Sequence, residues 1–328
     1  MDRTFRVPED GKPDVSRPAA VLPLPRRLNG MTGRLPVTPA IPEQARARLA
    51  DFIIIGAMKA GTSSLASYLA SHPDVFVTNP KEPDFFIAGA NWERGLHWYA
   101  QLFTQAKEGA LLGEASTSYT KHPICTGAPA RIRATVPDAR LIYLLRDPID
   151  RVVSHYRHEL LRGRETRPLI TALDQDERYL APSRYGAQLE RYLDHFDSSQ
   201  LLVLYSEDLL DRREETVRKA LIHIGADPDR AHHDFDWTAH TTAQARAPLP
   251  PLARLQSTSL YRALTRLVSE RIKARARRWT QRRISDFDPK LWELDEETIS
   301  RLRGELAAEL GPVREVGGPT PWSWAEGE

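Results

Sequence analysis

Short apolar runs alternate with stretches of helical periodicity through the middle of the chain. Runs of this length that are rich in β-branched residues and bounded by Gly, Pro or polar residues are typical of buried strands. The predicted strands are residues 52–55, 75–77, 111–112, 141–145 and 201–205. Apolar positions at helical spacing follow three of these runs, and we expect helices at 62–71, from about 149 and from about 214. Strands that alternate with helices predict an α/β fold with a central parallel sheet of about five strands, flanked by helices.

The two ends of the chain have different patterns from the middle. Residues 1–50 carry charges and prolines throughout and no sustained apolar period, which is typical of a flexible, proline-rich arm. Residues 248–283 contain apolar positions at helical spacing with arginines between them, and a further helix is expected at 296–310. We therefore predict a core over residues 51–247 and a helical, basic extension of the same domain over residues 248–328.

Composition and charge limit the classes of function. The chain has 328 residues, of which 41% are hydrophobic, so it can bury a large core. Its formal net charge of +2 is too small to imply nucleic-acid binding, so we expect no nucleic-acid partner and any anion site must be local. The single cysteine, Cys125, excludes an intrachain disulfide and argues against a cysteine–histidine zinc site, and we expect no metal. No apolar stretch has the length of a membrane span or of a signal-peptide core, so we expect a soluble, cytoplasmic protein.

The segment between the first predicted strand and its helix, residues 56–65, has the chemistry of an anion site. Backbone N–H groups at a helix start are unpaired and carry partial positive charge. Gly56 and Gly61 allow the backbone to turn and to approach an anion closely, and Lys59 adds a positive charge. The residues expected to bind the anion are Lys59, Ala60, Gly61, Thr62, Ser63 and Ser64. In the P-loop of nucleoside triphosphatases the lysine follows the last glycine, whereas here Lys59 precedes Gly61. The alternative is a turn of small residues that packs a helix on a strand.

A second pattern suited to phosphate binding follows the fourth predicted strand. Arg146 stands at the carboxyl end of that strand, where open parallel sheets bind ligands. Pro148 suits the start of a helix, and Ser154 lies two turns into that helix. A guanidinium group and a hydroxyl eight residues apart suit a terminal phosphate. The alternative for this segment, taken alone, is a salt-bridged turn.

These two segments together resemble the nucleotide-binding motifs of sulfotransferases that use 3'-phosphoadenosine-5'-phosphosulfate (PAPS). Residues 56–65 are similar to the 5'-phosphosulfate loop of that family, and residues 141–156 are similar to its 3'-phosphate motif. The resemblance covers residue 51 to about residue 228. It implies a P-loop-like sheet, PAPS as the sulfuryl donor and no metal. It also implies a late phosphate-binding loop near residues 241–246, in which Arg246 is the candidate residue.

Three further segments resemble the heparan-sulfate-type branch of this family, the glucosaminyl N- and O-sulfotransferases and their bacterial relatives. They are residues 79–86, 95–99 and 113–119. In that branch a glutamate acts as general base, and the matching residue is Glu82. Such a carboxylate would activate the acceptor by taking its proton, while Lys59 would stabilise charge on the leaving phosphate oxygen. Ala115 and Asp84 depart from the branch, which often has a lysine and a histidine or glutamine at these positions. The resemblance therefore indicates the reaction more strongly than a carbohydrate acceptor.

Other residues are candidates for the acceptor side of the site. Glu114 is the alternative base, and otherwise it orients the site or contacts the substrate. Trp98 and His155 are candidates for substrate contact. His155 is also an alternative base, because some cytosolic sulfotransferases use a histidine. The arginine-rich stretch 262–283 is a candidate for peripheral contact with a membrane or with an acidic acceptor, although most such charge runs are solvated helix faces.

The sequence thus predicts an enzyme that transfers a sulfuryl group from PAPS to a hydroxyl or amine by in-line displacement with a glutamate base. The acceptor would be a glycan, a glycolipid or a small metabolite. One alternative is a P-loop-type nucleotide phosphotransferase or kinase, which would need a Walker lysine and a magnesium-binding carboxylate. Another is a non-catalytic, sulfotransferase-like binding protein. The presence of Lys59, Arg146, Ser154 and Glu82 favours the enzyme.

Overall fold

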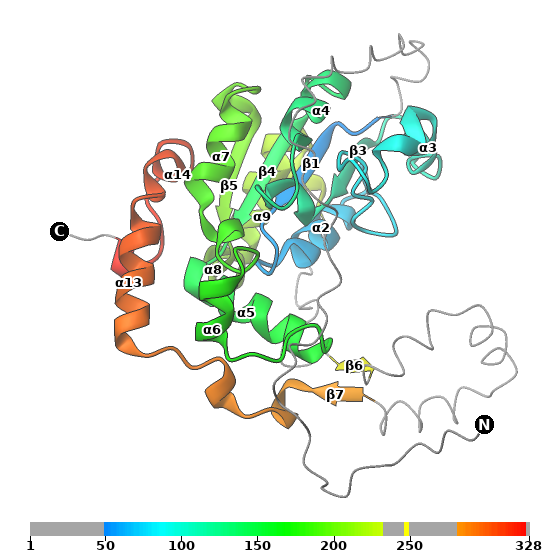
Figure 1. Cartoon of the computed structure of the whole chain (residues 1–328). Helices are drawn as coiled ribbons and strands as arrows, with labels where there is room; N and C mark the ends of the chain where they lie inside the picture. The colour runs from blue at the N-terminus through cyan, green and yellow to red at the C-terminus, as the bar shows by residue number, and fades with distance from the viewer. Residues whose placement is uncertain (1–48, 232–245, 249–280, 326–328) are drawn as a thin grey trace, which may run out of the picture. The chain divides into compact units, whose positions relative to one another are not determined.

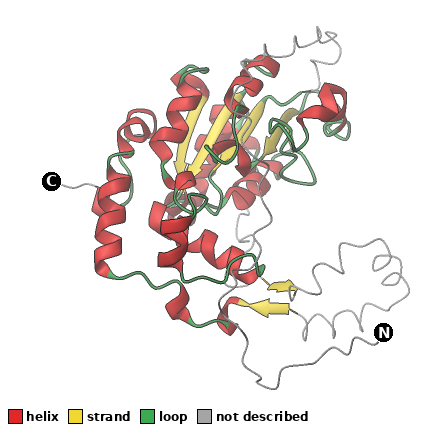
Figure 2. Ribbon diagram, viewed as in Figure 1, coloured by secondary structure: helices red, strands yellow, loops and turns green. Residues whose placement is uncertain are grey.

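A computed structural model of the chain describes residues 49–231, 246–248 and 281–325 (Figure 1). Its centre is a sheet of five parallel strands in the order β2-β3-β1-β4-β5, and helices flank this sheet (Figure 2). The strands are β1 (Phe52–Gly56), β2 (Val75–Val77), β3 (Leu111–Ala115), β4 (Arg140–Leu145) and β5 (Leu201–Tyr205). The predicted α/β fold with a parallel sheet of about five strands is confirmed.

Burial explains why the central strands read as continuous apolar runs. Residues 52–55 of β1 and 141–145 of β4 are all 0% exposed. Both strands have paired neighbours on each side, and helices cover the sheet. β3 is longer than the predicted residues 111–112 and continues to Ala115. Glycine, glutamate and alanine are poor strand formers, but β1 and β2 both pair with β3, and this tertiary pairing overrides the local preference.

Helices follow β1, β4 and β5 as the periodicity predicts. They are α2 (Thr62–Ala70), α5 (Pro148–Leu161) and α9 (Arg213–Ile224), with the short helix α8 (Ser206–Asp211) directly after β5. Pro148 suits the first position of α5. The Asp147 carboxylate caps this helix by accepting hydrogen bonds from the backbone N–H groups of Ile149 and Asp150. The periodicity did not predict α3 (Gly95–Gln101), α4 (Ala128–Thr135), α6 (Leu169–Gln175) and α7 (Tyr185–Leu193).

The described C-terminal residues are largely helical, with a break that the sequence pattern did not predict. Instead of one helix over residues 296–310, the chain forms α13 (Glu296–Ala307) and α14 (Leu310–Gly317). Pro312 has no backbone N–H and is tolerated only in the first turn of a helix, so a new helix begins just before it. α13 packs on α5, and α14 packs on α7 and on β5 (Figure 1). The C-terminal helices therefore extend the same core.

The predicted helical segment 248–283 needs correction at both of its ends. β6 (Arg246–Pro248) pairs antiparallel with β7 (Gln281–Arg283). A strand of three residues is too short to show an alternation of apolar and polar positions, and its partner strand lies far away in the sequence. The local pattern therefore could not predict either strand. The rest of the segment, residues 249–280, lies outside the described residues.

Three other predictions concern parts of the chain that are described little or not at all. The arm over residues 1–50 is described only at Leu49 and Ala50, and both are buried. The boundaries of the core and of its C-terminal extension stay predictions, as does membrane contact through residues 262–283. In the described parts of the chain, no helix combines the length and the apolar character that a membrane crossing requires.

Candidate active site

The candidate site lies at the carboxyl ends of the parallel strands. Strand β1 has β3 and β2 on one side and β4 and β5 on the other. The strand order therefore reverses between the neighbours β1 and β4, which is a topological switch point of the sheet. Open parallel sheets bind ligands in the crevice at such a point. Lys59 follows β1, Arg146 follows β4, and Glu82 follows β2. Because all five strands are parallel, the topology brings these three residues to one edge of the sheet.

The loop between β1 and α2 turns through backbone conformations that its glycines permit. At Gly56 a Cβ atom would collide with the Thr120 hydroxyl, so only glycine fits there. Gly61 caps α2 with a φ of 96°. Lys59 also lies in the left-handed region, with a φ of 72°, which costs a residue with a Cβ roughly 1 kcal/mol. Strain of this kind clusters at ligand sites, and the start of a helix such as α2 carries a partial positive charge that favours an anion.

Positive charge converges on this loop. Burial is the largest cause that lowers the pKa of Lys59, and the charges of Arg146 and Arg162 lower it further. Glu159 and Glu82 oppose this shift. Cations from the end of β4 and from the end of α5 therefore lie within electrostatic range of Lys59. A bound anion would relieve their mutual repulsion.

The turn after β4 places Arg146 at the edge of this group. Its Nη2 atom lies 2.8 Å from Asp150 Oδ2 of α5, and the side chain is 31% exposed. The salt-bridged turn considered from the sequence is thus present. A guanidinium group has five N–H donors, and one ion pair leaves capacity to bind a phosphate. Ser154, two turns along α5, is 5% exposed.

Glu82 lies beside the loop between β1 and α2. Its backbone N–H donates to the Ala115 carbonyl, at 3.1 Å, and its φ is 61°. Its carboxylate accepts a hydrogen bond from the Thr117 hydroxyl, at 3.3 Å, and lies 3.2 Å from Lys81 Nζ. Lys81 also donates to the Thr62 hydroxyl of α2, at 3.0 Å. The Glu82 side chain is 44% exposed, so it is linked to the loop and open to solvent.

Glu114 has the opposite surroundings. It is 0% exposed, and its carboxylate accepts hydrogen bonds from the hydroxyls of Tyr99 at 2.8 Å, Ser116 at 2.9 Å and Tyr119 at 3.1 Å. Burial raises the pKa of Glu114 to about 7, although the three hydroxyl donors oppose the shift. Ser116 in turn accepts from the backbone N–H of Asp84, at 3.1 Å. Through Ser116, Glu114 is thus linked to the backbone of the segment that carries Glu82.

The remaining candidates from the sequence are Trp98, His155 and Arg246, and their surroundings differ. Trp98 of α3 is half-buried against the Arg94 guanidinium, 4.2 Å from its ring centroid, and against Phe85. His155 is 6% exposed and lies against the Tyr179 ring. Burial, and then the Arg151 charge, lowers the pKa of His155 to about 2. These surroundings make His155 a poor base. Arg246 lies in β6, opposite Arg283, and its phosphate-binding role stays a prediction.

Two further residues, His158 and Arg162, lie near the loop. Burial, and then the charges of Lys59 and Arg162, lower the pKa of His158 to about 4, so His158 of α5 and Arg162, which directly follows α5, lie near the loop. Ser154, His158 and Arg162, the residue that caps the end of α5, stand four residues apart and therefore lie on the same side of this helix. This spacing was available in the sequence as a signal. In the described part of the chain no group of three or more His, Cys, Asp or Glu could hold a metal ion.

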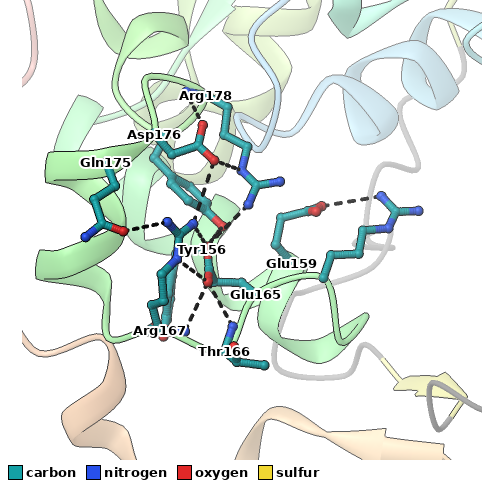
Figure 3. Close-up of polar contacts among 10 residues, drawn as sticks. Tyr156, Glu159, Glu165, Thr166, Arg167, Gln175, Asp176 and Arg178 are labelled. Atoms are coloured by element: carbon teal, nitrogen blue, oxygen red, sulfur yellow. Dashed lines mark hydrogen bonds and ion pairs between the residues drawn. The ribbon is translucent and has the colours of Figure 1, made fainter. Parts of the chain in front are cut away.

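An ion-pair network fixes the segment that follows α5. Figure 3 shows Glu165 pointing toward Arg167 and Arg178. The Glu165 Oε2 atom lies 2.7 Å from Arg167 Nη2 and 3.3 Å from Arg178 Nη2. The Tyr179 hydroxyl also donates to Glu165, at 2.9 Å. Burial raises the pKa of Glu165, but hydrogen bonds from Arg167, Thr166 and Tyr179 outweigh it and lower the value to about 2. The network anchors the chain just beyond the end of α5 that carries His158 and Arg162.

The chain is similar to several known proteins. It is 31% identical over 182 residues to the bifunctional heparan sulfate N-deacetylase/N-sulfotransferase 2 of Bos taurus, covering 49% of this chain and 20% of the relative. It is 31% identical over 193 residues to the heparan sulfate glucosamine 3-O-sulfotransferase 3A1 of Mus musculus, covering 56% of this chain and 47% of the relative. The chain thus spans less than half the length of these relatives.

A solved structure and a family model are also similar to this chain. A crystal structure of a sulfotransferase from Alicyclobacillus acidocaldarius superposes with a TM-score of 0.59 at 24% identity, covering 84% of this chain and 98% of that one. This match shows the same fold. The family model described as "Sulfotransferase domain" matches residues 49–239, which is more than half of the chain. The chain therefore belongs to the sulfotransferase domain family.

Proposed function

We propose that the protein transfers a sulfuryl group from PAPS to a hydroxyl or amine of an acceptor. The observation that carries this proposal is the grouping at one edge of the sheet. Lys59 and the neighbouring cations converge on the start of α2, and the solvent-open Glu82 is linked to the same loop through Lys81. One half of this grouping suits an anionic donor, and the other suits proton removal from an acceptor.

The residues present fit a nucleotide with several negative charges. The loop residues 59–64 would hold the 5'-phosphosulfate of PAPS, and Arg146 with Ser154 would hold its 3'-phosphate. Burial is the largest cause of the lowered pKa of Lys59, but the charges of Arg146 and Arg162 lower it further, and a bound anion would compensate these charges, which supports the assignment. Arg246 is proposed as a further phosphate ligand on the resemblance alone. No metal has a part in this proposal.

Two side chains divide the chemistry. The donor supplies the activated sulfuryl group. Glu82 takes the proton of the acceptor hydroxyl or amine, and Lys59 stabilises the charge that develops on the phosphate oxygen as the sulfuryl group leaves. An in-line displacement requires the acceptor to approach from the side opposite the phosphate. The exposure of Glu82 supports its assignment to that side.

The surroundings of the other candidates favour Glu82 as the base. Glu114 is fully buried and its carboxylate is already occupied by three hydroxyl donors, so we propose that it orients the Glu82 segment. His155 is buried near several cations, which oppose its protonation. Trp98 is half-buried beside Phe85 and is proposed as an acceptor contact.

The acceptor is proposed to be a glycan, a glycolipid or a small metabolite. The similar proteins named above are heparan sulfate sulfotransferases, which supports a sugar hydroxyl or amine. Asp84 lies next to Glu82, which raises its pKa in addition to the larger effect of burial. Two carboxylates on the acceptor side disfavour a highly sulfated acceptor, because like charges repel. A single cysteine is compatible with a reducing compartment, and a cytoplasmic location is part of the proposal.

Ligand preference tests the proposed function against the kinase alternative. The thermal midpoint of the protein is measured with the desulfated donor, 3'-phosphoadenosine-5'-phosphate (PAP), with ATP, and with ATP plus Mg²⁺. A ligand that binds only the folded state raises the midpoint according to its affinity. We expect PAP to raise it without metal and well above ATP. Equal or greater stabilisation by ATP with Mg²⁺ would reject the sulfotransferase proposal. Sulfate transfer to a panel of sugars and alcohols then separates an active enzyme from a non-catalytic binding protein.

A further inference from the structure

Three elements from elsewhere in the chain hold the turn formed by Arg146 and Asp147. The Tyr185 hydroxyl of α7 donates to the Arg146 carbonyl oxygen, at 2.8 Å. The backbone N–H of Asp147 donates to the Glu207 carboxylate of α8, at 2.8 Å. The third contact comes from the C-terminal segment, where the indole Nε1–H of Trp324 donates to Asp147 Oδ2, at 2.6 Å. These contacts fix the backbone from which the Arg146 side chain extends.

Asp147 connects the C-terminal segment to both α5 and Arg146. Its Oδ1 atom accepts from the backbone N–H groups of Ile149 and Asp150, each at 2.9 Å. The Asp150 carboxylate then pairs with the Arg146 guanidinium, at 2.8 Å. A hydrogen bond to an ionised carboxylate is stronger than one between neutral groups. One oxygen of the Asp147 carboxylate therefore accepts the hydrogen bond from Trp324, and the other oxygen caps the first turn of α5.

Trp324 is itself held in place. Its ring stacks on Trp322, with centroids 6.3 Å apart and planes at 9°. Trp322 is 4% exposed and packs against the rings of Tyr185 and Tyr205. The Arg314 guanidinium of α14 donates to the Ala325 carbonyl oxygen. The segment that presents the Trp324 indole is thus anchored on α14, α7 and β5.

We propose that Trp324 is a positioning residue for the nucleotide site, which through Asp147 holds Arg146 where it binds the 3'-phosphate of the donor. Trp324 lies outside residues 49–239, the part that matches the family model. The site then depends on a residue that the family match does not contain. This inference rests on the proposed function, because it assumes that Arg146 contacts the 3'-phosphate.

The test compares two nucleotides that differ only in the 3'-phosphate. Calorimetry measures the dissociation constants of PAP and of adenosine 5'-monophosphate for the full-length chain and for Trp324→Phe, which keeps a ring and removes the N–H donor. We expect PAP binding to weaken about tenfold in the variant, since a hydrogen bond to a charged group is lost. Binding of adenosine 5'-monophosphate is expected to stay unchanged. Trp292→Phe is the matched control, because Trp292 belongs to the same C-terminal part and contacts Arg157 rather than the turn.

A second variant approaches the same hydrogen bond from its other end. Asp147→Asn keeps Oδ1 as the cap of α5 and replaces the oxygen that accepts from Trp324, because asparagine is as good an N-cap as aspartate. It should show the same loss for PAP alone, and the double variant should lose no more than either single one. Asp147→Asn also provides the measurement if Trp324→Phe fails to fold.

Arg146→Ala separates the two proposals. If Arg146→Ala weakens PAP selectively while both Trp324→Phe and Asp147→Asn leave it unchanged, the positioning role is rejected and the proposed function stands. Equal weakening of both nucleotides by Trp324→Phe also rejects the positioning role, because it indicates general support of the fold. If Arg146→Ala weakens both nucleotides equally, the 3'-phosphate assignment fails, and the inference built on it fails too.

Discussion

At the scale of single residues, two carboxylates on neighbouring segments lie in very different surroundings. The Glu82 side chain is half-exposed and lies beside Lys81, whereas the Glu114 side chain is fully buried and accepts hydrogen bonds from three hydroxyls. A general base needs access to the acceptor proton, and an orienting group needs fixed partners. From the sequence alone, both residues were candidates for the general base, and their roles stayed open. Burial and hydrogen bonding assign them different proposed roles.

The division of labour between Glu82 and Lys59 gives the first prediction at this scale. Glu82→Gln keeps the shape of the side chain and removes the base, so turnover should fall by roughly 10²–10⁴, the usual contribution of general acid–base catalysis. PAP binding should hardly change. Lys59→Ala should lower turnover and also weaken PAP binding, because Lys59 is proposed to contact the donor both in the ground state and in the transition state. Steady-state rates beside PAP calorimetry measure both effects.

The reverse pattern would reassign the base. If Glu82→Gln keeps near-full turnover while Glu114→Gln abolishes it with PAP binding intact, the wrong carboxylate has been chosen. Retention of activity by both variants would leave the glutamate-base mechanism without support. A fold check by circular dichroism accompanies each variant, since Glu114 is buried among partners that its loss would leave unpaired.

Glu114 also gives a prediction for the pH dependence of stability. Its pKa is about 7 in the folded protein and about 4.5 in the unfolded chain. The native state therefore binds the extra proton between these values, and the stability that Glu114 contributes is present below pH 4.5 and is lost as pH rises through 7. A shift of this size corresponds to about 3 kcal/mol. Relative to the wild type, the free energy of unfolding of Glu114→Gln should rise by roughly 2–3 kcal/mol from pH 5 to pH 8.

Urea unfolding at several pH values between 5 and 8 measures this difference. Glu165→Gln is the matched control, because the pKa of Glu165 is lowered to about 2 and its contribution is lost only at more acidic pH. The Glu165→Gln curve should run parallel to that of the wild type over this range. A parallel curve for Glu114→Gln would show that Glu114 is ionised in the folded protein across the range.

At the scale of elements, α5 organises much of the candidate site. Its first turn is capped by Asp147, one side carries Ser154 and His158 with Arg162 at the helix end, and another face packs on α13. Beyond its last turn, the Glu165 network holds the following segment (Figure 3). A helix fixed at both ends can present cations to a ligand without ordering them at the moment of binding.

Removal of the Glu165 charge tests this view of α5. Glu165 is 4% exposed and accepts from two arginines and a tyrosine, so Glu165→Gln leaves donors poorly paired and should cost on the order of 1–3 kcal/mol of stability. Amide hydrogen exchange should become faster over residues 159–168 than elsewhere. Lys219→Gln on the exposed face of α9 removes an exposed ion pair with Glu215 and serves as the control. Unchanged exchange over residues 159–168 would show that α5 does not depend on the network.

At the scale of the whole molecule, the site is assembled from segments far apart in the chain. The candidate anion-binding loop follows β1, the candidate base follows β2, and the turn proposed to bind the 3'-phosphate follows β4. Support for that turn comes from α7, from α8 and from the C-terminal segment. The net charge of +2 gives no sign of an anion site, because a sum over the chain does not show that Lys59, Arg146 and Arg162 lie near one another.

The sequence by itself determined the features that arise from local chemistry. Buried strands such as β4 and β5 have continuous apolar sequences, and the glycines and lysine of residues 56–61 predict an anion-binding loop. The family resemblance then gave Glu82 and Arg146 as candidates before any geometry was known. These signals were sufficient because periodicity, turn residues and motif spacing all act over a few neighbouring residues.

Only the tertiary structure decided which residues share an environment. It extended β3 through residues with little strand preference, divided the predicted C-terminal helix and paired β6 with β7. It sealed Glu114 among hydroxyls and brought Trp324 to Asp147 across 177 positions of the chain. The physical reason is that burial, electrostatic field and hydrogen-bond partners depend on distance in space. A linear pattern carries no information on that distance beyond a few turns of a helix or one strand.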